Sequence, residues 1–193
     1  MKRSLCLFTV AIGLILTGCL VPSLHPLYND NEVVTRPGIA GRWSPEDGDA
    51  IWDFELEPDS SYSLAYVDSD ESDTSWFTVR LVQLDTFLFM DMYPDPSEVL
   101  TDAYKSHLIA AHTFSRIDID SDAITISVLD ADWLRKSIDS GWVKIAHEQL
   151  GPDDLVLTAG TQELRMFLLS IVDDTDAFSS VDLYRQMAGQ PPK

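Results

Sequence analysis

The side chains that could do chemistry in this sequence do not combine into a recognisable reaction centre. His107 and His112 are five residues apart, so on an extended strand they face opposite sides and cannot hold one metal ion. His147 and the following glutamate begin like a zinc-protease helix, but Gly151 stands where the second histidine is required. After residue 19 there is no Gly-x-Ser-x-Gly or Ser-x-x-Lys nucleophile motif and no phosphate-binding glycine loop. We therefore predict a protein that is not an enzyme, with no cofactor.

The acidic turns predict no metal site either. Residues Asp118 to Asp122 alternate like the first half of a calcium loop. Ala123 and Leu129 then replace the glycine and the glutamate that such a loop needs. We expect solvated turns here and at Asp68 to Asp73, with loose calcium binding as the alternative. A glycosidase-type carboxylate pair, about 5–10 Å apart, cannot be chosen from so many acids.

The N-terminus carries the most informative pattern. Lys2 and Arg3 precede an apolar run from Leu5 to Leu16. That run has the length of a signal-peptide core and is too short to cross a membrane as a helix. It ends in Leu16-Thr17-Gly18-Cys19, where small residues precede a cysteine.

This ending resembles the lipobox of bacterial lipoproteins. The resemblance implies cleavage between Gly18 and Cys19, a diacylglycerol thioether on Cys19 and an acyl chain such as palmitate on its amine. The acyl chains would anchor the protein to a membrane in the cell envelope. Residue 20 is Leu rather than the Asp that commonly signals inner-membrane retention, so the resemblance points to the outer membrane, facing the periplasm. Cys19 would be the only cysteine left, which excludes disulfides and thiol catalysis.

The composition restricts the partners. The 193 residues contain 13 Lys and Arg against 32 Asp and Glu, a net charge of −19. Removal of Lys2 and Arg3 with the leader would lower this charge to −21. Nucleic acid is excluded, because its binding depends on clustered cations. The hydrophobic content of 45% is enough for a real core.

We divide the chain into four parts. They are a signal peptide (1–18), a lipidated N-terminus and tether (19–38), a single β-rich domain (39–187) and a flexible tail (188–193). The stretch Ser23-Leu24-His25-Pro26-Leu27-Tyr28, followed by the strand Gly41-Arg42-Trp43, resembles a family of uncharacterised bacterial lipoproteins. The resemblance continues in Asp132-Trp133-Leu134 and Leu157-Thr158-Ala159. It implies location and fold and gives no activity.

The body of the domain alternates apolar and polar residues in the manner of half-buried strands. The expected strands are 39–44, 50–56, 61–67, 75–82, 86–92, 107–119, 123–129 and 181–185. A short helix capped by Asp130 or Asp132 and a second from about Gln162 to Val172, with Thr161 as its N-cap, complete the pattern. The fold class is therefore mainly β, an antiparallel up-and-down meander with two short helices.

Gly41 and Trp43 on the first strand resemble the Gly-x-Trp signature of lipocalin-like barrels. The resemblance implies that Trp43 closes one end of the barrel and that an arginine from the last strand, here Arg185, covers its ring by a cation–π contact. A closed lipocalin-like barrel and a more open sheet covered by the helices both fit this pattern.

Three functions remain open. The leading hypothesis is a non-catalytic envelope domain that binds a small apolar ligand inside the barrel or an envelope partner on its surface. A structural or assembly scaffold and a carboxylate-dependent envelope hydrolase are the alternatives. The strand aromatics from Trp52 to Phe89 would line a ligand cavity in a carrier, and otherwise they pack as an ordinary core.

Overall fold

The computed structural model describes residues 20–29, 32–48, 50–68, 74–95, 107–151 and 154–186. Its strands are β1 (Val33–Val34), β2 (Gly41–Ser44), β3 (Ala50–Leu56), β4 (Tyr62–Asp68), β5 (Thr74–Leu84), β6 (Phe87–Pro94), β7 (Thr113–Ile119), β8 (Ala123–Leu129), β9 (His147–Gln149), β10 (Leu155–Leu157) and β11 (Phe178–Arg185). Its helices are α2 (Ala131–Asp139) and α3 (Thr161–Ile171), with the 3-10 turns η1 (Pro37–Ile39) and η2 (Thr175–Ala177). Within the described residues, no helix is long and apolar enough to span a bilayer.

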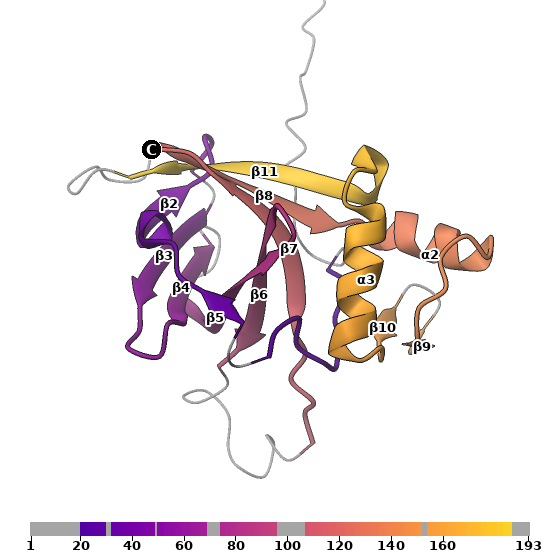
Figure 1. Ribbon diagram of the computed structural model, residues 1–193. Helices are drawn as coiled ribbons and strands as arrows, with labels where there is room; N and C mark the ends of the chain where they lie inside the picture. Colours follow the sequence, from indigo (N-terminus) through magenta and orange to yellow (C-terminus); the bar gives the residue numbers. More distant parts are fainter. Residues whose placement is uncertain are drawn as a thin grey trace, which may run out of the picture.

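The main sheet closes on itself (Figure 1). Strands β2 to β8 follow one another in order, β11 lies between β8 and β2, and β5 pairs with β6 to complete the ring. All of these pairings are antiparallel. The fold is thus a lipocalin-like barrel with two helices, which confirms the closed form and removes the open half-barrel.

Helices α2 and α3 lie in the sequence between β8 and β11, the last two strands of the barrel. Asp130 directly follows β8, and its side chain accepts a hydrogen bond from the Trp133 N–H at 2.7 Å, so it is the N-cap of α2. The N-cap of α3 is Gly160 rather than Thr161, because the Thr161 hydroxyl donates to the Pro26 carbonyl instead. Figure 1 shows α3 lying against the outside of the barrel, with α2 and the β9–β10 hairpin beyond it.

The inside of the barrel is filled by side chains. Trp43, Tyr62 and Leu64 are each 0% exposed, and they belong to one continuous buried cluster with inward residues of every barrel strand. A cavity that admitted water would leave accessible surface on the side chains that line it. Close packing of this kind is that of an ordinary protein interior. Trp52, Phe54 and Tyr62 are therefore core residues, and Tyr66 packs against them while partly exposed.

A second buried cluster lies outside the barrel. The outward side of β6, with Phe89, packs against Leu164, Phe167 and Leu168 of α3 and against Leu27 from the N-terminal segment. Phe89 was grouped above with residues that could line a cavity, but it faces away from the barrel interior. Trp76, from the same group, is exposed on the barrel surface.

The structure corrects one strand boundary and adds contacts to the N-terminal stretch. β7 begins at Thr113 rather than at residue 107, and His107 to Ala111 form no strand. The predicted tether is not a free linker, because Val21, Ser23 and Leu27 are buried. The carbonyls of Pro22 and Pro26 accept hydrogen bonds from the Leu157 N–H and the Thr161 hydroxyl, so these prolines fit an ordered segment. This stretch therefore packs against the barrel domain from Val21 onward.

Candidate functional site

The first candidate site surrounds Trp43 on β2. Trp43 is fully buried, and its Nε1 donates to the Ile39 carbonyl at 2.8 Å. The Arg185 guanidinium lies 4.2 Å from the centre of the Trp43 ring. It also donates to the carbonyls of Gly38 at 2.7 Å and Ala40 at 3.2 Å. The structure therefore brings together the three predicted residues Gly41, Trp43 and Arg185.

Two features favour glycine at position 41: its backbone conformation and the Arg185 side chain beside it. Its φ is +121°, a conformation that side chains rarely adopt. A Cβ at this position would lie 2.9 Å from Nη1 of Arg185. The glycine of the Gly-x-Trp pattern thus makes room for the arginine. Trp43 has no exposed surface to offer a ligand, so its contacts with Arg185 and Ile39 are packing contacts.

The second candidate site is the N-terminal segment, which we define as residues 20–29. It lies between His112 and β10, forming one antiparallel bridge from Ser23 to His112 and one parallel bridge from Ser23 to Leu157. Ser23 and His112 exchange two backbone hydrogen bonds of 2.8 Å, and Leu157 bonds to Pro22 and Leu24 at 2.8 and 2.9 Å. The segment is therefore an integral strand-like part of the fold.

A buried acid fixes the next turn of this segment. Asp91 on β6 is 1% exposed, and its Oδ2 accepts the Leu27 N–H at 2.7 Å. Its Oδ1 lies 2.7 Å from Nδ1 of His112. An Asp–His pair of this kind orients the imidazole in many hydrolases. Here the imidazole packs against Tyr93, with ring centres 4.6 Å apart. Asp91 and the backbone of His112 both form hydrogen bonds with the N-terminal segment.

Helix α3 holds the end of the same segment. Thr161 donates to the Pro26 carbonyl at 2.8 Å, and Nε of Arg165 donates to the Leu27 carbonyl at 2.8 Å. Arg165 also forms an ion pair with Glu32. The Arg165 guanidinium, followed by the Asn29 side chain, lowers the pKa of Glu32 from its ordinary value of 4.5 to about 2.

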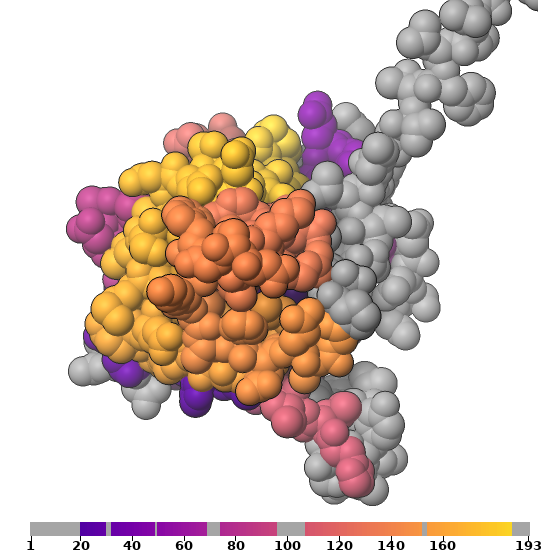
Figure 2. Space-filling view, turned by 90° about the vertical axis from the view of Figure 1, so that its right-hand side faces the viewer, coloured from indigo at the N-terminus to yellow at the C-terminus, as the bar shows by residue number. Residues whose placement is uncertain are grey.

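The third candidate site is an open groove, which we call the α3 groove (Figure 2 shows this face of the molecule). Its volume is about 410 Å³ and it lies between α3 and the loop that follows α2. Its lining residues are Trp142, Val143, Lys144, Glu163, Met166, Phe167, Ser170 and Ile171.

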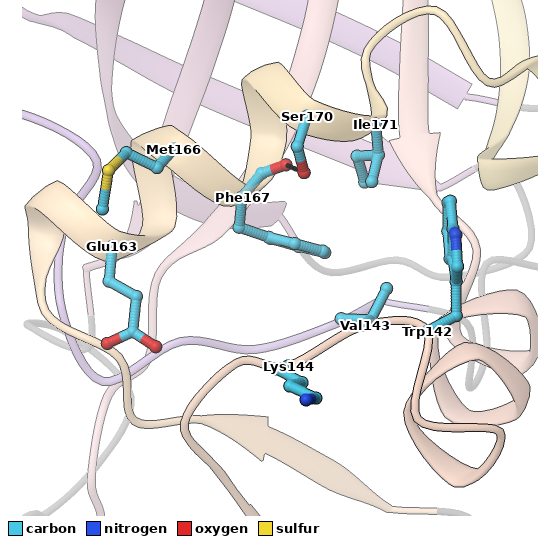
Figure 3. A pocket seen from close by; sticks show the side chains of 8 residues that line it. All are labelled: Trp142, Val143, Lys144, Glu163, Met166, Phe167, Ser170 and Ile171. Carbon is cyan, nitrogen blue, oxygen red and sulfur yellow. Dashed lines mark hydrogen bonds between the residues drawn. The ribbon is translucent and has the colours of Figure 1, made fainter.

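The groove is lined by apolar side chains together with Lys144, Glu163 and Ser170, so its surface is mixed in character. Figure 3 shows Phe167, Val143 and Ile171 converging, with Trp142 as a wall at one end and Glu163 at the other. Trp142 is 61% exposed and Met166 is 58% exposed, which is unusual for side chains of this size. The position of Trp142 is set by Trp133 of α2, which meets it edge-on with ring centres 5.4 Å apart.

The other predicted residues lie either outside the described part of the chain or apart from the three sites above. Cys19 and the cleavage position at Gly18 lie outside the described residues, as does most of the acidic turn at 68–73. His147 is on strand β9 rather than on a zinc-protease helix. No group of three or more potential metal ligands occurs in the part of the chain that the structure describes.

Sequence reasoning missed two features. The Asp91–His112 pair joins residues 21 positions apart, and a lone acid in a strand gave no signal except its place in an apolar run. The α3 groove was missed because nothing in the local sequence marks Trp142 as exposed. For Met166, the offset from the buried stripe at 164, 167, 168 and 171 was the available signal.

Comparison with protein-family models, with curated proteins and with solved structures finds no match to this chain. The function must therefore be argued from the geometry above.

Proposed function

We propose that this protein is a lipid-anchored lipoprotein of the bacterial envelope whose barrel domain binds an envelope partner without catalysis. The anchor is the diacylglycerol on Cys19, and the location is the outer membrane, facing the periplasm. This half of the proposal rests on the basic start, the apolar run and the small residues before Cys19.

The binding half is carried by one observation: the α3 groove lies outside a barrel whose interior is filled. Side chains such as Trp43 and Leu64 leave no accessible surface inside. A carrier of the lipocalin type encloses its ligand and buries most of it. In this domain the groove is on the outer surface, so a bound molecule would stay in contact with solvent unless a partner covered both.

The lining favours an apolar contact rather than a reaction. Its ionisable side chains are Lys144 and Glu163. Glu163 accepts the Ala146 N–H at 3.2 Å and so helps to hold the loop. The two acids that a glycosidase needs are not among the described lining residues.

The chemistry of the groove indicates the kind of partner. An exposed tryptophan beside apolar side chains is typical of the few residues that carry most of the energy of a protein interface. We expect a protein segment that inserts an apolar side chain over Phe167 and is flanked by polar groups that meet Lys144 and Glu163.

Photo-crosslinking in the intact envelope tests this function. A photoreactive residue at Met166 should give one discrete adduct, and the same residue at Trp76, which is 49% exposed on the barrel, should not. The adduct should weaken when Trp142 is replaced by Ala, a change at an exposed position that leaves both cores intact. Equal labelling from both positions would refute the groove as the binding site.

Two mass measurements test the lipid anchor and the small-ligand carrier. Intact mass spectrometry of the mature protein should give the mass of a chain beginning at Cys19 with its acyl groups. Native mass spectrometry of the Cys19→Ser domain should give the mass of the protein alone. A reproducible extra mass released on denaturation would instead support the small-ligand carrier.

A further inference from the structure

We propose that the outward side of residues 20–24 is a membrane-contacting edge, which holds the anchored domain in one orientation against the lipid surface. This inference rests on the lipid anchor proposed above. The occupant is the headgroup and glycerol region of the bilayer, rather than a protein partner.

The first observation is the alternation of burial along the N-terminal segment. Val21 and Ser23 are 6% and 0% exposed and point into the domain. Leu20 and Leu24 are 38% and 40% exposed. This period of two is that of an extended strand, so residues 20, 22 and 24 lie on the outward side. That side presents Leu, Pro and Leu.

The second observation is the short reach of the anchor. Val21 belongs to the buried cluster outside the barrel, and the backbone hydrogen bonds of residues 22–24 fix the segment in place. Two Cα–Cα steps separate residue 19 from Val21, at most about 7.6 Å. The headgroup layer on each side of a bilayer is about 5–8 Å thick. A lipid on Cys19 therefore brings the outward side of this segment to the membrane surface.

The third observation is the charge. The chain carries 32 acids against 13 Lys and Arg, yet residues 20–29 contain no Asp, Glu, Lys or Arg. The uncharged segment is directly attached to the anchor. An acidic domain approaches lipid at the lowest electrostatic cost through such a segment, and the contact needs no anionic lipid. Leucine side chains at this depth gain from burial in the boundary between headgroups and acyl chains.

The experiment uses the lipidated full chain in vesicles of phosphatidylethanolamine and phosphatidylcholine. Because the Cys19 sulfur is alkylated, a new cysteine is the only one that takes a spin label. Leu24→Cys reports on the proposed edge, and Leu56→Cys, 43% exposed at the end of β3, is the matched control. Accessibility to a water-soluble nickel relaxant should fall several-fold at position 24 on membrane binding and stay unchanged at position 56.

A second variant tests the short reach itself. About 12 Gly and Ser residues inserted between Leu20 and Val21 span roughly 20 Å, which is longer than the headgroup layer is thick. The inserted chain should keep the protein on vesicles while position 24 regains accessibility. Unchanged circular dichroism melting would show that the insertion leaves the domain folded.

The outcomes separate this inference from the proposed function. A protein that lacks the acyl mass and does not float with vesicles would refute the anchor, and the edge with it. A protein that carries the acyl mass and floats, but whose position 24 is as accessible as position 56, would refute the edge alone. Protection that persists with the inserted linker would support the edge itself and would refute only the short reach as the cause of the orientation.

Discussion

Replacement of Asp91 by Ala tests how the N-terminal segment is held. Asp91 is 1% exposed, and its two oxygens meet the Leu27 N–H and Nδ1 of His112, both at 2.7 Å. The change leaves two polar groups in a buried site without their partner. Each costs about 1–3 kcal/mol. We therefore expect a loss of about 2–6 kcal/mol in the free energy of unfolding.

The assay is urea unfolding of the mature Cys19→Ser domain, followed by tryptophan fluorescence. Asp91→Asn keeps one acceptor oxygen in the same shape, so it should lose less than the Ala variant. Asp53→Ala is the control, because Asp53 is 39% exposed in its ion pair with Arg42 and such surface pairs contribute about 0–1 kcal/mol.

Hydrogen exchange gives a second measurement of the same change. The amides of Ser23 and Leu27 should exchange faster in the Ala variant, because both bonds depend on the site around Asp91 and His112. A loss below about 1 kcal/mol, with no faster exchange at these amides, would refute the reasoning that the buried acid fixes the segment.

Three further substitutions test the packing around Trp43 and the pH dependence of stability. Trp43→Ala should cost about 3–5 kcal/mol in urea unfolding, because it empties a fully buried site and removes the bond to Ile39; a loss under about 1 kcal/mol would contradict this packing role. Gly41→Ala should cost about 1–3 kcal/mol, because φ is +121° and Nη1 of Arg185 would be 2.9 Å from the new Cβ; full stability would show that the arginine moves aside freely. The pKa of Glu32 is lowered to about 2, so its contribution to stability is complete above pH 4.5 and is lost as the pH falls through 2. Glu32→Gln should therefore flatten the dependence of the urea midpoint on pH in that window, whereas an unchanged slope would contradict the pairing with Arg165.

Local patterns predicted the strands of the barrel well, because such patterns depend only on residues close to one another in the sequence. The alternation in β3, β4 and β8 reflects one side facing the barrel interior, and it can be counted along the chain. The buried stripe of α3 was visible for the same reason. Gly41, Trp43 and Arg185 were found from a three-residue pattern and the last strand, and the structure shows that steric need for the arginine explains the glycine.

The N-terminal segment is ordered by partners that are distant in sequence. Three prolines between residues 22 and 37 disfavour regular local structure, and that local preference predicted a tether. The bonds that order the segment come from Asp91, His112 and Leu157, which no window of the sequence brings near it.

The sequence by itself determined the acidic charge and the lipoprotein pattern before Cys19 and indicated most of the barrel strands, because these depend on composition and short-range periodicity. Tertiary structure alone decided the rest. Whether the barrel is filled depends on how side chains from all strands meet, and the α3 groove exists because α3 and the loop after α2 leave Trp142 and Met166 uncovered. The outward side of residues 20–24 was likewise set only when the segment paired with His112 and Leu157, since long-range pairing chooses which face of a strand is buried.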